Sequence, residues 1–353
     1  MDERKLTVAA IGLQGCAEIL LDIAWGEPTL RIAAVGDTDQ TRAEAAARKY
    51  ECASYTDYRQ LIVQNKADIL IVGAPAHQST EYIRQAIQKK MNILTQWPWA
   101  VNFEQGAEFI NLAEREGVLF VVAQNGRFSR PFEQVMQYLH NSVEQSNTLY
   151  LISAVCHLPS GPLKPSQRWL YDPQLSGGGV LMQNCYNLID ELVLCFGLPQ
   201  RVYTLTQSQA PDRQQRLSLT EDTAIVSMQF SDTLMGQICA SRTLGPARRH
   251  LRIHGKDLHL TATPEEVVLC DNAGNELNRT AYENDQRSAL GRLLENLAKH
   301  LIEPEKNPLY PEHGIDLNTL AVIEAAYLSA RTGMAEQPGR ILRLGGAESS
   351  ALL

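Results

Sequence analysis

Residues 6–17 read LTVAAIGLQGCA, and this stretch decides the fold. Leu6–Ile11 is an apolar run with the length of a buried strand, and the residues around Ala17–Ala24 have the spacing of an amphipathic helix. Gly12 permits a tight turn between the two elements, and Ala17 permits the helix to pack closely on the strand. We therefore predict a strand–turn–helix unit of the kind that opens a dinucleotide-binding sheet.

The turn itself predicts a phosphate-binding loop. Such a loop normally has a second glycine that lets the backbone approach a pyrophosphate, and Gln14 stands at that position, although Gly15 beside it leaves room. The start of the helix offers free N–H groups and a favourable dipole to an anion. The cofactor contacts predicted in this loop are Gly12, Gln14, Gly15, Cys16 and Ala17.

A second nucleotide signal lies at the end of the next apolar run. Asp37 follows Gly12 by 25 residues, near the position of the acid that binds the ribose 2′-hydroxyl in such units. A carboxylate there accepts a hydrogen bond from NAD and repels the 2′-phosphate of NADP. The alternative is that Gly12 and Asp37 only form turns. The spacing favours NAD(H) over NADP(H).

Apolar runs and helix-period segments alternate as far as residue 125, which predicts a Rossmann domain, 1–125, with a doubly wound parallel sheet. The further strands expected are Leu30–Val35, Asp68–Val72, Asn92–Leu94 and Val118–Ala123. The further helices expected are Thr41–Lys49, Thr80–Lys89 and Phe103–Glu116.

The pattern changes near Gly126, so we predict a second α/β domain, 126–353, with a large, mainly antiparallel open sheet. Its expected strands are Leu149–Val155, Val202–Gln207, Thr223–Phe230, Met235–Ser241, His250–His254 and Val267–Asp271. Two long helices, Glu283–Ile302 and Asp316–Arg331, are expected to follow.

Composition excludes several function classes. The 353 residues include 40 acidic and 32 basic side chains, a net charge of −8, which disfavours nucleic acid as a partner. No apolar stretch approaches the ~20 residues of a membrane span, and the first residues lack the apolar region of a signal peptide. The seven cysteines are scattered without a CxxC pair, and the eight histidines show no HxH or HExxH grouping. We expect a cytoplasmic protein without a metal site, a disulfide framework, or a membrane or nucleic-acid partner.

Several short motifs, in their order and spacing along nearly the whole chain, carry a family resemblance. They are Ala74-Pro75, Gly117–Phe128 (GVLFVVAQNGRF), Trp169 before Gly177–Gly179, Ile189-Asp190, Glu221–Thr223, Ile323–Ala326 and Ser329–Gly333. With the opening strand–turn–helix unit, the chain resembles the glucose–fructose oxidoreductase, inositol dehydrogenase and MocA family.

The resemblance implies sugar or polyol oxidation or reduction with NAD(P), and a homodimer or homotetramer through the C-terminal sheet. It also implies that Ala74, Pro75, Trp97 and Pro98 lie at the cofactor.

The chain departs from the family at its proton-handling positions. The family's Glu-Lys-Pro segment is Gln96-Trp97-Pro98 here, and its aspartate and histidine after the glycines are Gln183 and Asn187. Carboxamides and indole do not exchange a proton near neutral pH. We therefore expect the usual alcohol-dehydrogenase mechanism to be absent, with Gln183 and Asn187 still on the substrate side.

The segment between His157 and Tyr171 offers replacements. His157 and Lys164 are the candidates for acid–base chemistry, and Arg168 and Tyr171 are further substrate-side candidates; a solvated loop is the alternative reading. Trp97 either stacks on a planar ligand or packs at the domain junction.

Two function hypotheses follow. The first is an NAD(P)-dependent oxidoreductase with a non-standard site for a sugar, a polyol or another small hydroxyl or carbonyl compound, with a bilin reductase-like variant included. The second is a catalytically inactive family member that serves as a ligand-binding or oligomeric scaffold.

Overall fold

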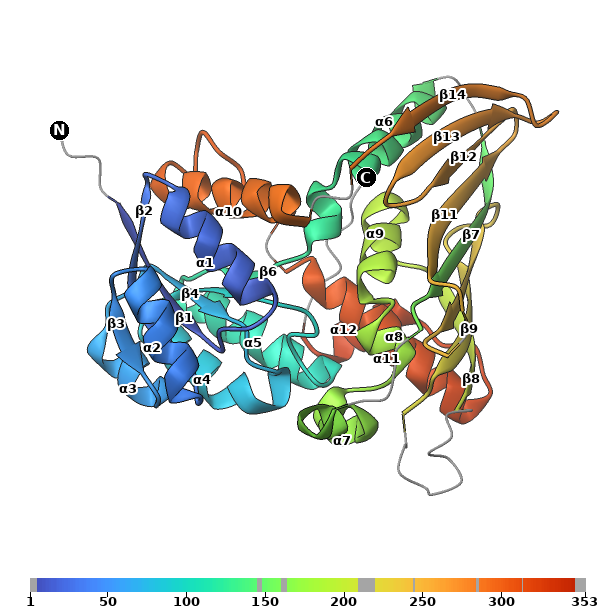
Figure 1. Ribbon diagram of the computed structural model, residues 1–353. Helices are drawn as coiled ribbons and strands as arrows, with labels where there is room; N and C mark the ends of the chain where they lie inside the picture. The colour runs from blue at the N-terminus through green and yellow to red at the C-terminus, as the bar shows by residue number, and fades with distance from the viewer. Residues whose placement is uncertain are drawn as a thin grey trace. The chain divides into compact units, whose positions relative to one another are not determined.

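The run Leu6–Ile11 is the strand β1 of a parallel sheet (Figure 1). Its residues from Val8 to Ile11 are fully buried. The computed structural model describes residues 5–144, 148–159, 164–208, 220–243, 245–283, 286–312 and 314–346. The chain forms two compact units. The first comprises Met1–Ala100, Glu104–Asn125 and Gln286–Ile315, and the second comprises Val101–Phe103, Gly126–Asp285 and Asp316–Leu353.

The first unit contains a six-stranded sheet in the order β3-β2-β1-β4-β5-β6, and every strand pair in it is parallel. This is the strand order of a dinucleotide-binding doubly wound sheet, as the sequence predicted. The strands after β1 are β2 (Leu30–Gly36), β3 (Ala53–Tyr55), β4 (Ile69–Val72), β5 (Asn92–Thr95) and β6 (Phe120–Val122).

Helices connect these strands. They are α1 (Cys16–Gly26), α2 (Gln40–Lys49), α3 (Tyr58–Gln64), α4 (Ala76–Gln88) and α5 (Phe103–Glu116). Helix α10 (Gln286–Ile302) belongs to the same unit and packs against α1. Leu293 and Leu297 are among its buried residues, and Arg287 lies 3.8 Å from Asp22 of α1. The first unit therefore includes a helix from late in the chain. The sequence predicted that this helix begins at Glu283, whereas α10 begins at Gln286; residues 284–285 lie outside the described residues.

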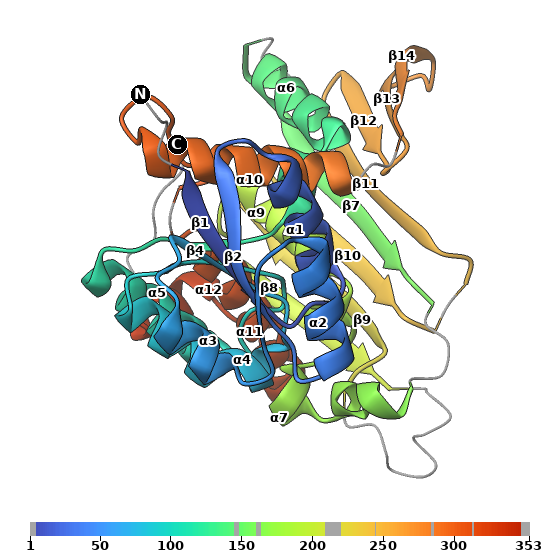
Figure 2. The ribbon, with the colours of Figure 1, turned by 60° about the vertical axis from the view of Figure 1, so that its left-hand side comes forward.

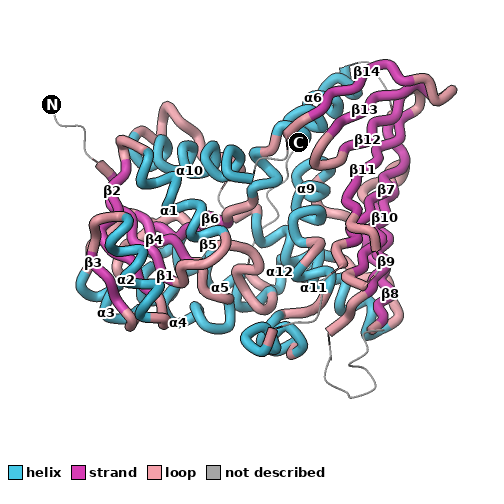
Figure 3. The backbone as a smooth tube through the Cα atoms, in the orientation of Figure 1, coloured by secondary structure: helices cyan, strands magenta, loops and turns pink. Residues whose placement is uncertain are grey.

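The second unit contains an eight-stranded sheet in the order β14-β13-β12-β11-β7-β10-β9-β8 (Figure 3). Only the β7–β10 pair is parallel, so the prediction of a mainly antiparallel sheet is confirmed. The strands are β7 (Leu149–His157), β8 (Arg201–Gln207), β9 (Thr223–Gln229), β10 (Met235–Ser241), β11 (Arg248–Gly255), β12 (Leu258–Ala262), β13 (Glu266–Asp271) and β14 (Glu276–Ala281).

The helices of the second unit gather on one face of this sheet (Figures 1 and 2). They are η1 (Asn125–Phe128), α6 (Arg130–Glu144), η2 (Pro165–Tyr171), α7 (Pro173–Ser176), α8 (Val180–Gln183), α9 (Tyr186–Phe196), α11 (Asp316–Thr332) and α12 (Pro338–Leu344). Side chains alternate between the faces of a strand, so Ile152 and Ala154 are buried under the helices while Leu151 is exposed on the other side. We call that other side the open face.

A buried ion network fixes three of these helical segments. The Arg127 guanidinium of η1 donates to both carboxylate oxygens of Asp190 in α9, at 2.7 and 2.5 Å, and to Asp316 Oδ1 of α11 at 2.5 Å. The Thr319 hydroxyl donates to Asp190 at 2.9 Å. Because both carboxylates contact the same guanidinium, neither is buried as an isolated ion.

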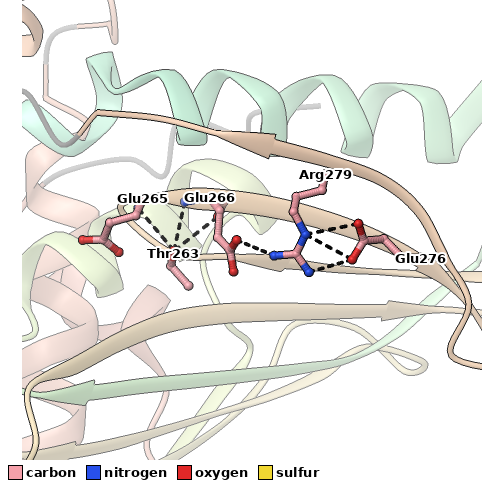
Figure 4. A network of polar contacts seen from close by, with 5 residues as sticks. All are labelled: Thr263, Glu265, Glu266, Glu276 and Arg279. Carbon is pink, nitrogen blue, oxygen red and sulfur yellow. Dashed lines mark hydrogen bonds and ion pairs between the residues drawn. The ribbon is translucent and has the colours of Figure 1, made fainter.

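The β14 edge of the sheet is strongly charged (Figure 4). Arg279 of β14 pairs with Glu266 of β13, and it also binds both carboxylate oxygens of Glu276 at 2.6–3.1 Å. The Thr263 hydroxyl accepts hydrogen bonds from the backbone of Glu265 and Glu266. Charged side chains discourage pairing of an edge strand with another chain.

Candidate nucleotide-binding site

The turns after β1 and β4 are packed backbone against backbone. Gly12 has φ +72°, and a Cβ there would lie 2.4 Å from the backbone nitrogen of Ala74. A Cβ on Gly73 would lie 2.2 Å from the Gly12 carbonyl oxygen and 2.5 Å from Cβ of Ala17. Small residues are thus required where the first helix, the first strand and the fourth strand meet.

The N-terminus of α1 lies open beside this contact. Gly15 is its cap, with φ +61° and no side-chain hydrogen bond to the helix, and Gly15 is exposed. A Cβ added to Gly15 would approach only Gln96 Oε1, at 3.9 Å. The first turn of α1 therefore keeps backbone donors for an anion, as phosphate-binding helices do.

Gln14 leaves this space clear because its side chain extends toward α2. Its carboxamide oxygen, oriented by hydrogen bonding, accepts from Arg42 Nη1 at 2.6 Å and Nη2 at 2.8 Å. Gln14, which stands in place of the second glycine, is thus bound to Arg42, a residue that was not predicted from the sequence to belong to the site. The sequence marks Arg42 only as a basic residue shortly after Asp37 and Asp39.

Asp37 is held rigidly at the end of β2. Its Oδ2 accepts from the Leu13 backbone at 2.9 Å, and its Oδ1 accepts from the Asp39 backbone at 2.9 Å and from Arg42 Nη1 at 2.8 Å. Asp37 is 3% exposed. The carboxylate links the loop after β1 to the end of β2, where the sequence predicted a ribose contact.

Cys16 begins helix α1. Burial raises the pKa of its thiol to about 12, so the group stays uncharged near neutral pH. In the loop it therefore offers its backbone rather than a thiolate.

The remaining predicted cofactor residues follow β4 and β5. Ala74 is buried and Pro75 precedes α4. Gln96 Nε2 donates to the Gly73 carbonyl at 2.8 Å, which joins the ends of these two strands. Trp97 is half-buried and is joined to Pro98 by a cis peptide bond.

The glycine motif of the second unit is explained by close contacts. A Cβ on Gly177 would lie 2.5 Å from the Val101 carbonyl, one on Gly178 would lie 2.0 Å from the Tyr327 hydroxyl, and one on Gly179 would lie 1.8 Å from the Glu221 carbonyl. The Glu221 side chain accepts from the backbones of Gly179 and Leu181 and from the Tyr327 hydroxyl at 2.8–3.0 Å. Burial raises the pKa of Glu221. The motif builds the entry to α8.

Gln183 and Asn187 lie on either side of the turn from α8 to α9. The Gln183 carboxamide donates to the Ser176 carbonyl at 2.6 Å, so it supports the loop around the glycines. Asn187 is half-buried in the first turn of α9.

His157 points away from this turn. Its neighbour Cys156 faces the helices and donates to the Asn184 carbonyl at 3.4 Å, whereas His157 lies on the open face, with Nε2 3.7 Å from the Cys239 sulfur. The structure therefore does not bring His157 together with Gln183 and Asn187.

The other candidates of this segment lie in and before η2. Lys164 and Arg168 are exposed, and Tyr171 is half-buried. Residues 160–163 of this segment lie outside the described residues.

The part of the chain that the structure describes contains no helix long and apolar enough to cross a membrane. In the same residues, no group of three or more His, Cys, Asp or Glu side chains is arranged to hold a metal ion.

Two stretches of the chain match domain models of one protein family. Residues 6–124 match the model described as the oxidoreductase family with an NAD-binding Rossmann fold, and residues 154–337 match the C-terminal alpha/beta domain of the same family. The chain belongs to this Gfo/Idh/MocA oxidoreductase family. The expected resemblance is thereby confirmed.

Individual relatives are distant. D-xylose 1-dehydrogenase (NADP(+)) 2 of Haloferax volcanii is 26% identical over 179 residues, which cover 49% of this chain and 52% of the relative. The chain spans about half the length of several of the curated relatives it matches, 45% and 52% in two cases.

Two solved structures show the same fold at 16% identity. An oxidoreductase from Agrobacterium radiobacter, in complex with NAD+, L-tartaric acid and magnesium, superposes with a TM-score of 0.79 over 96% of this chain and all of its own. Biliverdin reductase from Synechocystis sp. PCC 6803, in complex with biliverdin and NADP+, gives 0.77 over 92% and 99% of the two chains. The fold thus occurs with both cofactors.

Proposed function

We propose that the chain binds NAD(H) along the carboxyl ends of β2, β1, β4 and β5. The close packing of Gly12 on Ala74 and the open space over Gly15 suit a pyrophosphate at the start of α1. When bound, a nicotinamide cofactor supplies hydride chemistry, and the protein supplies binding and orientation.

The Asp37 carboxylate is the observation that carries this proposal. Its three hydrogen bonds fix it at the end of β2, where an adenosine ribose would lie. Arg42, which could otherwise bind a 2′-phosphate, is already paired with Asp37 and with Gln14. A fixed negative charge and an occupied guanidinium both favour NAD(H) over NADP(H).

We further propose oxidoreductase activity on a small sugar, polyol or other hydroxyl or carbonyl compound. Gln183 and Asn187 offer hydrogen bonds without titration, and Arg168 and Tyr171 would orient polar groups of the substrate. Of the two predicted acid–base residues, Lys164 is the one that we carry into this proposal, because His157 faces Cys239 on the open face.

An inactive scaffold is the second candidate, because Trp97, Gln183 and Asn187 stand where the family has its proton-handling residues. Assembly through the open face is compatible with both candidates. Five large apolar side chains of β7–β10, between 40% and 60% exposed, form what we call the apolar patch: Leu151, Tyr203, Leu205, Ile225 and Met235. We propose that this patch joins copies of the chain into a homodimer or homotetramer, in either functional case.

Seven cysteines without a disulfide support a cytoplasmic location.

Tryptophan fluorescence titration with NADH and NADPH tests the proposal. We expect NADH to bind more tightly than NADPH. We expect Asp37→Asn to reduce the ratio of the two affinities by about tenfold, because it removes the charge that repels the 2′-phosphate of NADPH. Turnover of polyols, sugars or biliverdin would favour the enzyme, whereas binding without turnover of any of them would favour the scaffold. Failure of both cofactors to bind at millimolar concentration would contradict nucleotide binding.

A further inference from the structure

Gln124 is a buried carboxamide whose polar atoms are unused. It lies two residues beyond β6 and is 1% exposed. Among the described residues, neither its Oε1 nor its Nε2 has a hydrogen-bond partner. Most buried polar groups in proteins are paired, and leaving one unpaired is unfavourable, so this side chain needs an explanation.

The backbone around Gln124 is firmly anchored. Its own N–H donates to the Val122 carbonyl at 2.7 Å, and the N–H of Ala123 donates to the Thr95 carbonyl at 2.7 Å. Thr95 is the last residue of β5 and directly precedes Gln96. Gln124 therefore stands at the carboxyl edge of the sheet, one strand beyond the Gln96 side chain that reaches Gly73.

The strand order gives the direction in which a dinucleotide would run along this edge. Asp37 follows β2, and the open start of α1 follows β1. If Asp37 holds the adenosine ribose and α1 the pyrophosphate, the other half of the molecule must extend toward the ends of β4, β5 and β6. That half ends in the nicotinamide ring, and Gln124 follows β6.

We propose that the Gln124 carboxamide recognises the carboxamide of the nicotinamide ring. A primary carboxamide has an acceptor oxygen and a donor NH₂, so two such groups can satisfy each other by a pair of hydrogen bonds. Gln124 thus selects the intact nicotinamide end of the cofactor. This inference rests on the proposed function, because it requires NAD to bind along the same edge.

The test compares NAD+ with ADP-ribose, which lacks the nicotinamide ring. Isothermal titration of the full chain and of Gln124→Leu measures both affinities. We expect the variant to bind NAD+ about tenfold or more weakly, the loss of hydrogen bonds in a buried site, and to bind ADP-ribose like the unmodified chain. Gln88→Leu, on the exposed end of α4, is the matched control and should change neither affinity.

The outcomes separate the two proposals. If the unmodified chain binds neither ligand, nucleotide binding itself is wrong. If it binds both and Gln124→Leu binds NAD+ unchanged, or loses both ligands equally, the role of Gln124 is overturned. Gln124→Met, which keeps the side-chain length without the amide, serves as a second variant if the leucine variant does not fold, and the same affinity ratio decides.

Discussion

At Arg127, one guanidinium faces two buried carboxylates. Asp190 and Asp316 both lie within 2.5 Å of its Nη2, and all three side chains are at most 6% exposed. Burial, together with the nearby charge of Asp190, raises the pKa of Asp316 to about 6, although Arg127 opposes the shift. Two carboxylates around one cation leave one negative charge in excess, and a proton on Asp316 removes it.

This raised pKa predicts a pH-dependent stability. Asp316 binds a proton more readily in the folded chain than in the unfolded one, whose aspartate titrates near 3.8, so its stabilising protonated form is lost as the pH rises from about 4 to 6. The penalty above pH 6 is of the order of 3 kcal/mol. We expect the stability of Asp316→Asn relative to the unmodified chain to increase over that window.

Thermal unfolding from pH 4 to 7 measures this difference. The control is Asp232→Asn, on an exposed turn, and its stability should differ from that of the unmodified chain by the same amount at every pH. A constant difference between the Asp316 variant and the unmodified chain at every pH would show that Asp316 does not titrate in this range.

At the scale of elements, the contact between the turns after β1 and β4 yields a paired test. Gly73→Ala would force its Cβ against the Gly12 carbonyl and Ala17. We therefore expect the free energy of unfolding to fall by about 2 kcal/mol or more, and NADH binding to be lost. A Cβ added to Gly26, at the end of α1, would have no neighbouring atom within 4 Å. Gly26→Ala should therefore leave the free energy of unfolding unchanged or raise it by up to about 1 kcal/mol. Urea unfolding and NADH titration measure both, and equal effects would contradict this packing.

The sequence was sufficient for elements whose residues repeat one pattern. The run Leu6–Ile11 is β1, and Met235–Ser241 is β10 as predicted. It was insufficient for β3, which has only three residues, and for β14, a polar edge strand without an apolar face. Helix α6 was also missed.

The candidate site divides in the same way. Gly12 and Asp37 have local signals, because one makes a turn and the other ends a strand. Arg42 and Gln124 have no such local signal. Arg42 is recognised by its hydrogen bond to Asp37 in the folded unit, and Gln124 by the lack of a partner for its buried side chain. A sequence pattern does not specify which buried carboxamide is left without a partner.

At the scale of the whole molecule, the two halves of the open face differ. The apolar patch covers β7–β10, and its members face each other in register: Leu205 is opposite Ile225, and Met235 is opposite Leu151. The far edge carries Arg279 and its glutamates instead. An exposed apolar group of this size usually marks an interface.

We therefore expect a double variant, Ile225→Glu with Met235→Glu, to dissociate the assembly, because charges buried without partners oppose association. Light scattering after size exclusion should give a dimer or tetramer for the unmodified chain and the mass of one chain for the variant. Val63→Glu, at a position that is at least as exposed but lies on α3 of the first unit, should leave the assembly intact. A monomeric unmodified chain, or a variant of unchanged mass, would refute this interface.

Helix α10 gives the molecule a particular order of assembly during synthesis. The six strands of the parallel sheet leave the ribosome long before residues 286–302, whose buried leucines pack within the same unit. Until then, the side of α1 that contacts α10 has no cover, while the whole antiparallel sheet is being made. We expect the nascent chain to depend on chaperones during that interval, and a fragment ending at residue 125 to aggregate rather than to form an independent nucleotide-binding module.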